Sequence, residues 1–416
     1  MNIYTLLILC FLVGIYLIQT ITDLLNIKNI SNDIPKEFEG FFDKEKYTKS
    51  QEYLRATTNF SIISSSFMLL IQIVFIVFGG FNYINDIALS FGFGTVTTGL
   101  IFVGILLFAV EILKIPFSVY SIFVMEEKFG FNKMNLKTFI TDFLKSLIIT
   151  AIVGAAVFSV ILLLFINFFQ YAWLYAFAAI VVFQLFLTFI APIVIMPLFN
   201  KYTPLEDGEL KTSVEEYAKK ESFKMKGLFK MNGSKRSTKS NAFFTGFGKS
   251  RRIVLFDTLI RNHTVEELTS VLAHEMGHFK LGHIIRRMIF SFVSTGAMLF
   301  ILSFFINKTW LYSAFLMQTQ PIYAGIIFFA FLYTPISLLL SIISSYFSRK
   351  DEYDADAYAV TTYKHPEAMI NALKKLSVNN LSNLYPCKLK VFLEYSHPPT
   401  LERINAINKL SSNLKL

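Results

Sequence analysis

Cysteine, tryptophan and charged side chains are all scarce in this chain. Of its 416 residues only two are cysteines, Cys10 and Cys387, and two are tryptophans. Two cysteines exclude a disulfide framework and a cysteine-rich metal site. Charged residues make up 16% of the chain and hydrophobic residues 54%, whereas a soluble domain has about 25% charged residues. The composition therefore indicates a membrane protein.

Seven apolar runs are predicted to be membrane spans, since a helix needs about 20 apolar residues to cross a bilayer. They cover residues 4–21, 59–81, 96–122, 147–168, 172–199, 288–306 and 322–346. In the third run, Glu111 and Lys114 are expected either to pair or to face a water-filled cavity, because isolated charges are costly at that depth.

Basic residues follow the spans in a regular alternation. The connections after spans one, three and five, and the segment after span seven, hold nearly all lysines and arginines. This pattern predicts an exterior N-terminus and a cytoplasmic C-terminus. It also accounts for the net charge of +10. Because no segment interleaves basic and aromatic residues, we expect the lipid bilayer and not nucleic acid as a partner.

The spans divide the chain into four predicted segments. Residues 1–199 hold five membrane helices, and residues 288–346 hold two more. Residues 200–287 and 347–416 are polar, and the loop alternation places both on the cytoplasmic side. We therefore expect one catalytic unit to be assembled from these two polar segments.

A histidine–glutamate motif supplies the first functional signal. Thr264 and Glu267 are predicted to form a capping box that begins a helix. Residues four apart share one face of a helix, so His274 and His278 can hold one metal ion. Glu275 lies about 100° around the helix, where it can act as general base. Two ordinary helix histidines are the alternative, but the chain has only six histidines.

Two histidines leave a catalytic zinc ion one protein ligand short, because such ions take three protein ligands and water. One type of site has a third histidine six residues after the second. That position holds Ile284 in this chain, so this type is excluded. The neighbouring His283 is expected to be a capping or surface residue.

An acidic helix after the seventh span can supply the missing ligand. Glu352 and Asp356 are four residues apart and share a face with Ala355 and Ala359, whose small side chains would permit close helix packing. We predict Glu352 as the third ligand and Asp356 as the hydrogen-bond acceptor of a ligand imidazole. The alternative is an acidic cap on a juxtamembrane helix.

Two further stretches are candidates for the site. Residues 241–247 and 251–256 resemble strands joined by a Gly-Lys-Ser turn, which predicts a β-hairpin. Such a hairpin can bind a substrate as an added strand or can be purely structural. His397 precedes two prolines and a final helix that contains Arg403. From the residues alone a structural role for His397 is favoured over hydrogen bonding to an oxyanion.

Taken together, these stretches resemble the integral-membrane zinc CAAX prenyl proteases, the family of the yeast a-factor converting enzyme. The resemblance is carried, in order, by residues 126–133, 197–206, 241–247, 274–278, 349–356 and 397–403. It implies an all-α polytopic membrane protein with seven transmembrane helices that enclose a hydrated chamber. A zincin-like catalytic domain with a small β-hairpin is expected on the cytoplasmic side.

The resemblance also implies roles for single residues. His274, His278 and Glu352 would bind one Zn²⁺ per chain, and Glu275 would be the catalytic base. Asn241 and Ala242 would line the substrate strand. His397 would face the scissile carbonyl, and Asp356 and Arg403 would support the site.

The expected activity is hydrolysis of peptide bonds near the C-terminus of prenylated peptides by a monomeric enzyme. A quality-control protease without prenyl specificity is the alternative, and a non-catalytic channel with structural zinc is a third possibility. The connection between the last two spans, residues 307–321, is short. The resemblance implies a longer link in eukaryotic members of the family, so this length favours a bacterial cytoplasmic membrane over the endoplasmic reticulum.

Overall fold

The computed structural model describes residues 2–246 and 252–415. Among these residues, seven helical stretches are long and apolar enough to cross a membrane, which confirms the seven predicted spans. They are α1 (Ile3–Lys28), α2 (Lys44–Val77), α4 with the π-helical turn η2 (Thr95–Tyr120 and Ser121–Glu126), α5 (Leu136–Asn167), α6 with η3 and α7 (Ala172–Ile190, Ala191–Ile195 and Met196–Phe199), α11 (His283–Phe305) and α13 (Ile322–Tyr363).

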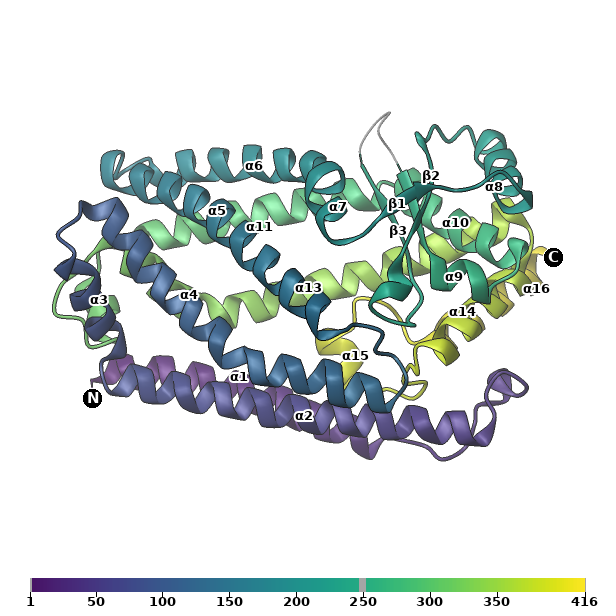
Figure 1. Cartoon of the computed structure of the whole chain (residues 1–416), viewed down its shortest axis with the longest axis horizontal. Coiled ribbons are helices and arrows are strands. Elements are labelled where there is room, and N and C mark those ends of the chain that lie inside the picture. The colour runs from purple at the N-terminus through teal and green to yellow at the C-terminus, as the bar shows by residue number, and fades with distance from the viewer. Residues whose placement is uncertain (1, 247–251, 416) are drawn as a thin grey trace.

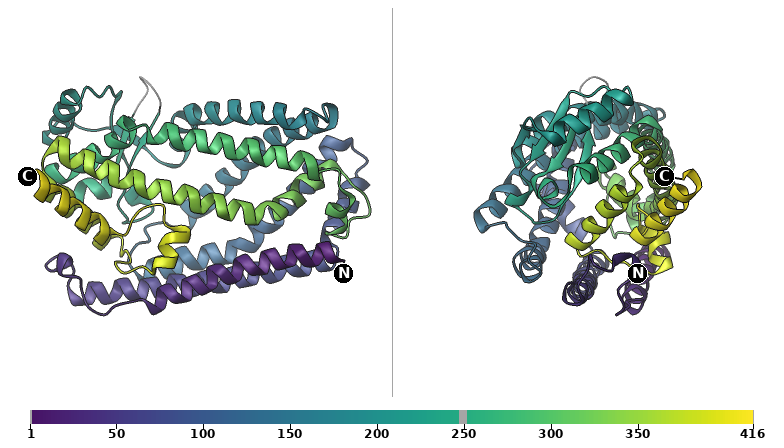
Figure 2. Two further views of the ribbon diagram at one scale, coloured as in Figure 1. Left: turned by 180° about the vertical axis from the view of Figure 1, so that it is seen from behind. Right: turned by 90° about the vertical axis from the view of Figure 1, so that its right-hand side faces the viewer.

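The spans run along the long axis of the molecule (Figure 1). Helices α1 and α2 pack together on one side, α6 and α11 pack together on the opposite side, and α13 contacts both α1 and α11. The short helices α3 (Gly80–Ser90) and α12 (Thr309–Ser313) lie at the end that holds the N-terminus (Figures 1 and 2). The polar segments gather at the other end, near the C-terminus.

The polar end is built from short helices around a small sheet. Its helical elements are α8 (Glu209–Lys220), α9 (Asp257–Asn262), α10 (Val265–Lys280), α14 (Pro366–Asn379), α15 (Lys388–Glu394), α16 (Thr400–Leu414), and the 3-10 turns η1 (Lys36–Phe38) and η4 (Gly233–Lys235). Leu255 of the sheet, Val214 of α8 and Leu272 of α10 are fully buried in one apolar cluster. The sheet and α10 therefore share a core.

The sheet has four strands and extends the predicted hairpin. Its strands are β1 (Tyr202–Pro204), β2 (Gly227–Met231), β3 (Ala242–Thr245) and β4 (Arg252–Phe256), in the order β1-β2-β4-β3. The antiparallel pair β3–β4 confirms the two predicted strands, while their Gly248-Lys249-Ser250 connection lies outside the described residues. β2 pairs with β4 in parallel, so β3 is an edge strand of the described sheet.

Two membrane helices continue into the polar end. α11 begins at His283 and α13 runs unbroken to Tyr363, so the predicted boundaries after residues 287 and 346 fall within helices. A third connection is made by Arg236, which donates to both carboxylate oxygens of Asp142 at 2.7 and 3.0 Å and to the carbonyl of Phe199 at 2.6 Å. The polar end is thus joined to α5, α7, α11 and α13.

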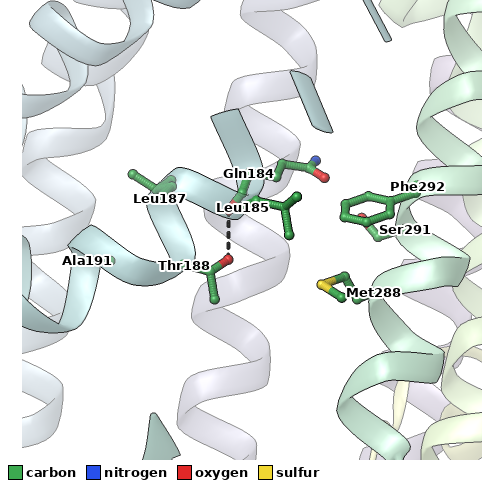
Figure 3. Close-up of a pocket in the computed structure, with 8 residues that line it drawn as sticks. All are labelled: Gln184, Leu185, Leu187, Thr188, Ala191, Met288, Ser291 and Phe292. Carbon is green, nitrogen blue, oxygen red and sulfur yellow. Dashed lines mark hydrogen bonds between the residues drawn. The ribbon is translucent and has the colours of Figure 1, made fainter. Parts of the chain in front are cut away.

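Cavities lie between several of the spans. One of about 380 Å³ separates α6 from α11, where Leu185 faces Met288 and Phe292 (Figure 3). The described residues that line it include no ionisable side chain. Another, of about 700 Å³, lies between α4 and α5 and is lined by Glu111. Glu111 also pairs with Lys114 at 3.2 Å, which confirms the predicted ion pair.

Candidate active site

Helix α10 begins as the sequence predicts. The backbone N–H of Glu267 donates to the Thr264 hydroxyl at 3.3 Å, and the Glu267 carboxylate accepts from the backbone N–H of Thr264 at 2.8 Å. This capping box satisfies backbone donors that the first turn leaves free. The register of α10 turns His274 and His278 toward α13, and their rings stand 4.7 Å apart.

Small residues allow α10 and α13 to pack closely. A Cβ atom on Gly277 would lie 3.1 Å from the Tyr358 side chain and 3.3 Å from the Ala355 Cα. Ala355 and Ala359 are buried, at 0% and 2% exposure. A larger side chain at this contact would push the helices apart. The predicted role of the alanines is therefore confirmed, and Gly277 has the same role on the opposite helix.

Three possible metal ligands meet where these helices touch. The Nε2 atoms of His274 and His278 lie 3.1 Å apart. The Glu352 carboxylate lies 3.4 Å from His274 Nε2 and 3.2 Å from His278 Nε2. A tetrahedral ion with bonds of about 2.0–2.2 Å holds its ligand atoms roughly 3.3–3.6 Å apart. Both the donor types and their spacing fit one metal ion.

The burial of Glu352 also favours a bound cation. Its side chain is only 2% exposed, and its Oε2 atom accepts no hydrogen bond from the described residues. The nearest arginine or lysine nitrogen among the described residues is Arg403 Nη1, at 3.5 Å. Leaving a buried carboxylate oxygen without a partner is costly, and a metal ion at this position would remove that cost.

Asp356 and Arg403 fix the orientation of the His274 ring through Nδ1, the ring nitrogen that is not assigned to the metal. Asp356 Oδ1 lies 2.8 Å from His274 Nδ1, so the imidazole can donate to this carboxylate and direct Nε2 toward the ligand group. Arg403 donates to both Asp356 oxygens, at 2.6 and 2.7 Å. The sequence-predicted pair thus lies where support of a ligand imidazole requires it.

Burial and neighbouring charges shift the pKa values of His274 and Glu275 in opposite directions. Burial by itself would lower the pKa of His274, but the hydrogen bond and charge of Asp356 raise that pKa to about 9. Desolvation raises the pKa of Glu275, while the neighbouring His274 and Arg403 oppose this rise. A carboxyl group with a raised pKa is better suited to accept and return a proton near neutral pH.

His283 is a site residue that the sequence prediction placed wrongly. It is not a surface residue, because it is only 2% exposed. Gly282, with a φ of 72°, bends the chain between α10 and α11. The two helices continue along α13 in the same direction, and the bend brings His283 Nδ1 to 2.9 Å from His278 Nδ1. A histidine placed directly after a glycine at the end of the motif helix was the available signal.

A second group that sequence reasoning missed joins α11 to α13. Asp351 is fully buried and contacts Arg286 directly, while Arg287 Nε lies 3.4 Å away. Arg287 also approaches Glu352, at 3.9 Å. These contacts hold α13 against the start of α11 on the side of Glu352 that faces away from Asp356.

The remaining predicted residues lie near the metal-ligand group or at the sheet edge. His397 Nε2 is 3.4 Å from Glu352 Oε1, and its side chain is 63% exposed, so it can reach a bound molecule. Asn241 is exposed and directly precedes edge strand β3, whose first residue is Ala242. β3 also contacts α10, so its edge lies close to the helix that carries the histidines.

Comparisons with known proteins agree with this geometry. Residues 23–201 match the CAAX prenyl protease N-terminal family, which has five membrane helices, and residues 204–411 match peptidase family M48. The chain is 36% identical to CAAX prenyl protease 1 of Saccharomyces cerevisiae, over 92% of this chain and 90% of that protein. It is 32% identical to the human CAAX prenyl protease 1 homolog, over 93% and 91% of the two chains.

A solved structure shows the same arrangement. The crystal structure of S. mikatae Ste24p superposes with a TM-score of 0.93 at 35% identity, covering 98% of this chain and 100% of that one. The fold, the metal-ligand group and the two family matches all agree with the resemblance found in the sequence. The chain belongs to peptidase family M48 and is a membrane metallopeptidase of the CAAX prenyl protease type.

Proposed function

We propose that this protein is a zinc endopeptidase that cleaves prenylated peptides near their C-terminus. The observation that carries the proposal is the meeting of His274, His278 and Glu352 beside Glu275. His₂Glu is a donor set typical of catalytic zinc, with a fourth position left for water. The relatives, which are CAAX prenyl proteases, support the prenyl specificity.

Each residue of the site has a distinct task in this proposal. His274, His278 and Glu352 would hold Zn²⁺, which would supply the Lewis acidity that makes water nucleophilic near neutral pH. Glu275 takes a proton from the attacking water and passes it to the leaving amine. His397 donates a hydrogen bond to the oxyanion that develops on the scissile carbonyl.

The substrate backbone would lie along β3. Only one side of this edge strand is paired within the described sheet, so its other side can bind an extended peptide. Asn241 and Ala242 are at the start of the strand. The side chain of Asn241 accepts from the Ala242 backbone N–H at 2.8 Å, which orders this entry point. A peptide bound here as an added strand would pass close to α10.

The basic connections support an exterior N-terminus and a catalytic site on the cytoplasmic side. The relatives named above are eukaryotic, which favours the endoplasmic reticulum over the bacterial membrane that the short connection 307–321 suggested. We propose a monomer, because all groups assigned to the site come from one chain. The proposed partners are a lipidated peptide and the bilayer.

The direct test compares two forms of one peptide. Detergent-purified protein is expected to contain one zinc ion per chain by elemental analysis. It should also cleave a farnesylated CAAX peptide with a higher kcat/KM than the unprenylated peptide of the same sequence. Equal cleavage of both forms, together with degradation of an unfolded membrane protein, would instead identify a quality-control protease.

Glu275→Gln should reduce kcat by about 10²–10⁴, the usual contribution of a general base. Zinc content and peptide binding should persist, because the amide has nearly the same shape and His274 and His278 remain. Glu266→Gln is the matched control, since Glu266 is exposed in the first turn of the same helix. Full activity of Glu275→Gln would remove this residue from the mechanism.

His283→Leu should weaken zinc binding about 10–100-fold, the usual cost of losing the partner of a ligand histidine. The reason is that His278 Nδ1 would lose the acceptor that orients its ring. Competition with a chelator measures the affinity without any turnover. His283→Asn is the control, because its amide oxygen can occupy the place of Nδ1. Unchanged affinity in His283→Leu would show that His283 does not position His278.

A further inference from the structure

A large apolar cavity lies between four of the membrane spans. It has a volume of about 550 Å³ and is lined from α1, α2, α4 and α13, by residues that include Leu12, Met68, Phe75, Leu106 and Phe331. This central apolar cavity falls within the size range of about 300–1,000 Å³ that is usual for ligand sites. The catalytic residues assigned above do not line it.

The central apolar cavity adjoins a polar one. Tyr16, Gln19 and Ser65 line both it and a second cavity of about 430 Å³, so the two are neighbours. The second, polar cavity lies between α1, α2 and α15 and extends to Asp23. Tyr16 precedes Asp23 by seven residues on α1, which is about 10 Å along a helix. Together the cavities form an amphipathic passage along α1 and α2.

The polar cavity ends beside the candidate active site. Its lining includes Tyr395, two residues before His397, which contacts Glu352. Arg349 of α13 donates to the Tyr395 carbonyl at 2.6 Å, only one turn before Glu352. A molecule bound at the metal-ligand group could therefore extend a flexible chain through the polar cavity into the central apolar cavity.

The charged residues of the passage limit which chemical groups can bind in it. Lys390 is held at 2.5 Å from both Asp23 and Glu394, so this group carries one net negative charge. A lipid phosphate would be repelled there, since the charge of Lys390 is already neutralised by the two carboxylates. An uncharged hydrocarbon chain attached to a peptide meets no such repulsion. The α4–α5 cavity is less suitable, because it has no lining residue in common with the polar cavity.

We propose that the central apolar cavity binds the isoprenoid chain of the substrate while the peptide occupies the metal centre. This inference rests on the proposed function and adds a location for the lipid. It assigns prenyl recognition to α1, α2, α4 and α13, far from β3, which binds the peptide. The preference for a prenylated peptide would then depend on free space in this cavity.

The first test narrows the cavity. Ala109 lines the central apolar cavity, and Ala151 lines the α4–α5 cavity, so Ala109→Trp and Ala151→Trp are matched variants. The measured quantity is kcat/KM for a farnesylated peptide divided by that for its unprenylated form. Ala109→Trp should lower this ratio at least about tenfold, as a methylene-sized misfit in an apolar pocket does. Ala151→Trp should leave it at the wild-type value.

The second test uses the wild-type protein, so it does not depend on the folding of a variant. A peptide whose isoprenoid ends in a photoreactive diazirine should crosslink to residues 12–19 or 65–75, which line the central apolar cavity and not the α4–α5 cavity; mass spectrometry identifies the crosslinked residues. Crosslinks confined to α6 and α11, or an unchanged ratio in Ala109→Trp, would overturn the cavity assignment alone. A wild-type ratio of one would overturn the proposed prenyl specificity as well.

Discussion

The contact between α10 and α13 is the constraint on which the site depends. Gly277 faces Ala355 so closely that even a methyl group would crowd the neighbouring helix. This contact brings a carboxylate on α13 within 3.4 Å of two imidazoles on α10. A metal ion would balance the charge of Glu352. Packing therefore sets the ligand spacing, and the metal would stabilise the packing in return.

The position of the site also depends on membrane helices that continue into the catalytic end of the molecule. α13 runs from the bilayer region through Glu352 and Asp356 without a break, while α11 begins at His283. The buried Asp351 joins these two helices through Arg286 and Arg287. A substrate that approaches within the membrane would thus meet a site already fixed relative to the spans. Loops or hinges are not needed to place it.

Much of this arrangement could be predicted because it depends on local periodicity. Apolar runs of about 20 residues identify spans, and a four-residue repeat of histidines places two rings on one helix face. Glu352 could be predicted since its helix combines acidic and small residues. The burial of His283 could not, because it depends on the direction of the bend between α10 and α11, which Gly282 marks but does not specify. Nor could the parallel pairing of β2 with β4, which joins strands distant in sequence.

X-ray absorption at the zinc edge tests the central claim most directly. On purified protein the account predicts one zinc ion with two nitrogen ligands at about 2.0–2.1 Å and oxygen ligands at about 2.0–2.2 Å. Glu352→Ala should lose the ion or change this ligand shell. Zinc that remains bound with an identical spectrum in Glu352→Ala would contradict the account, because the metal would then lie elsewhere.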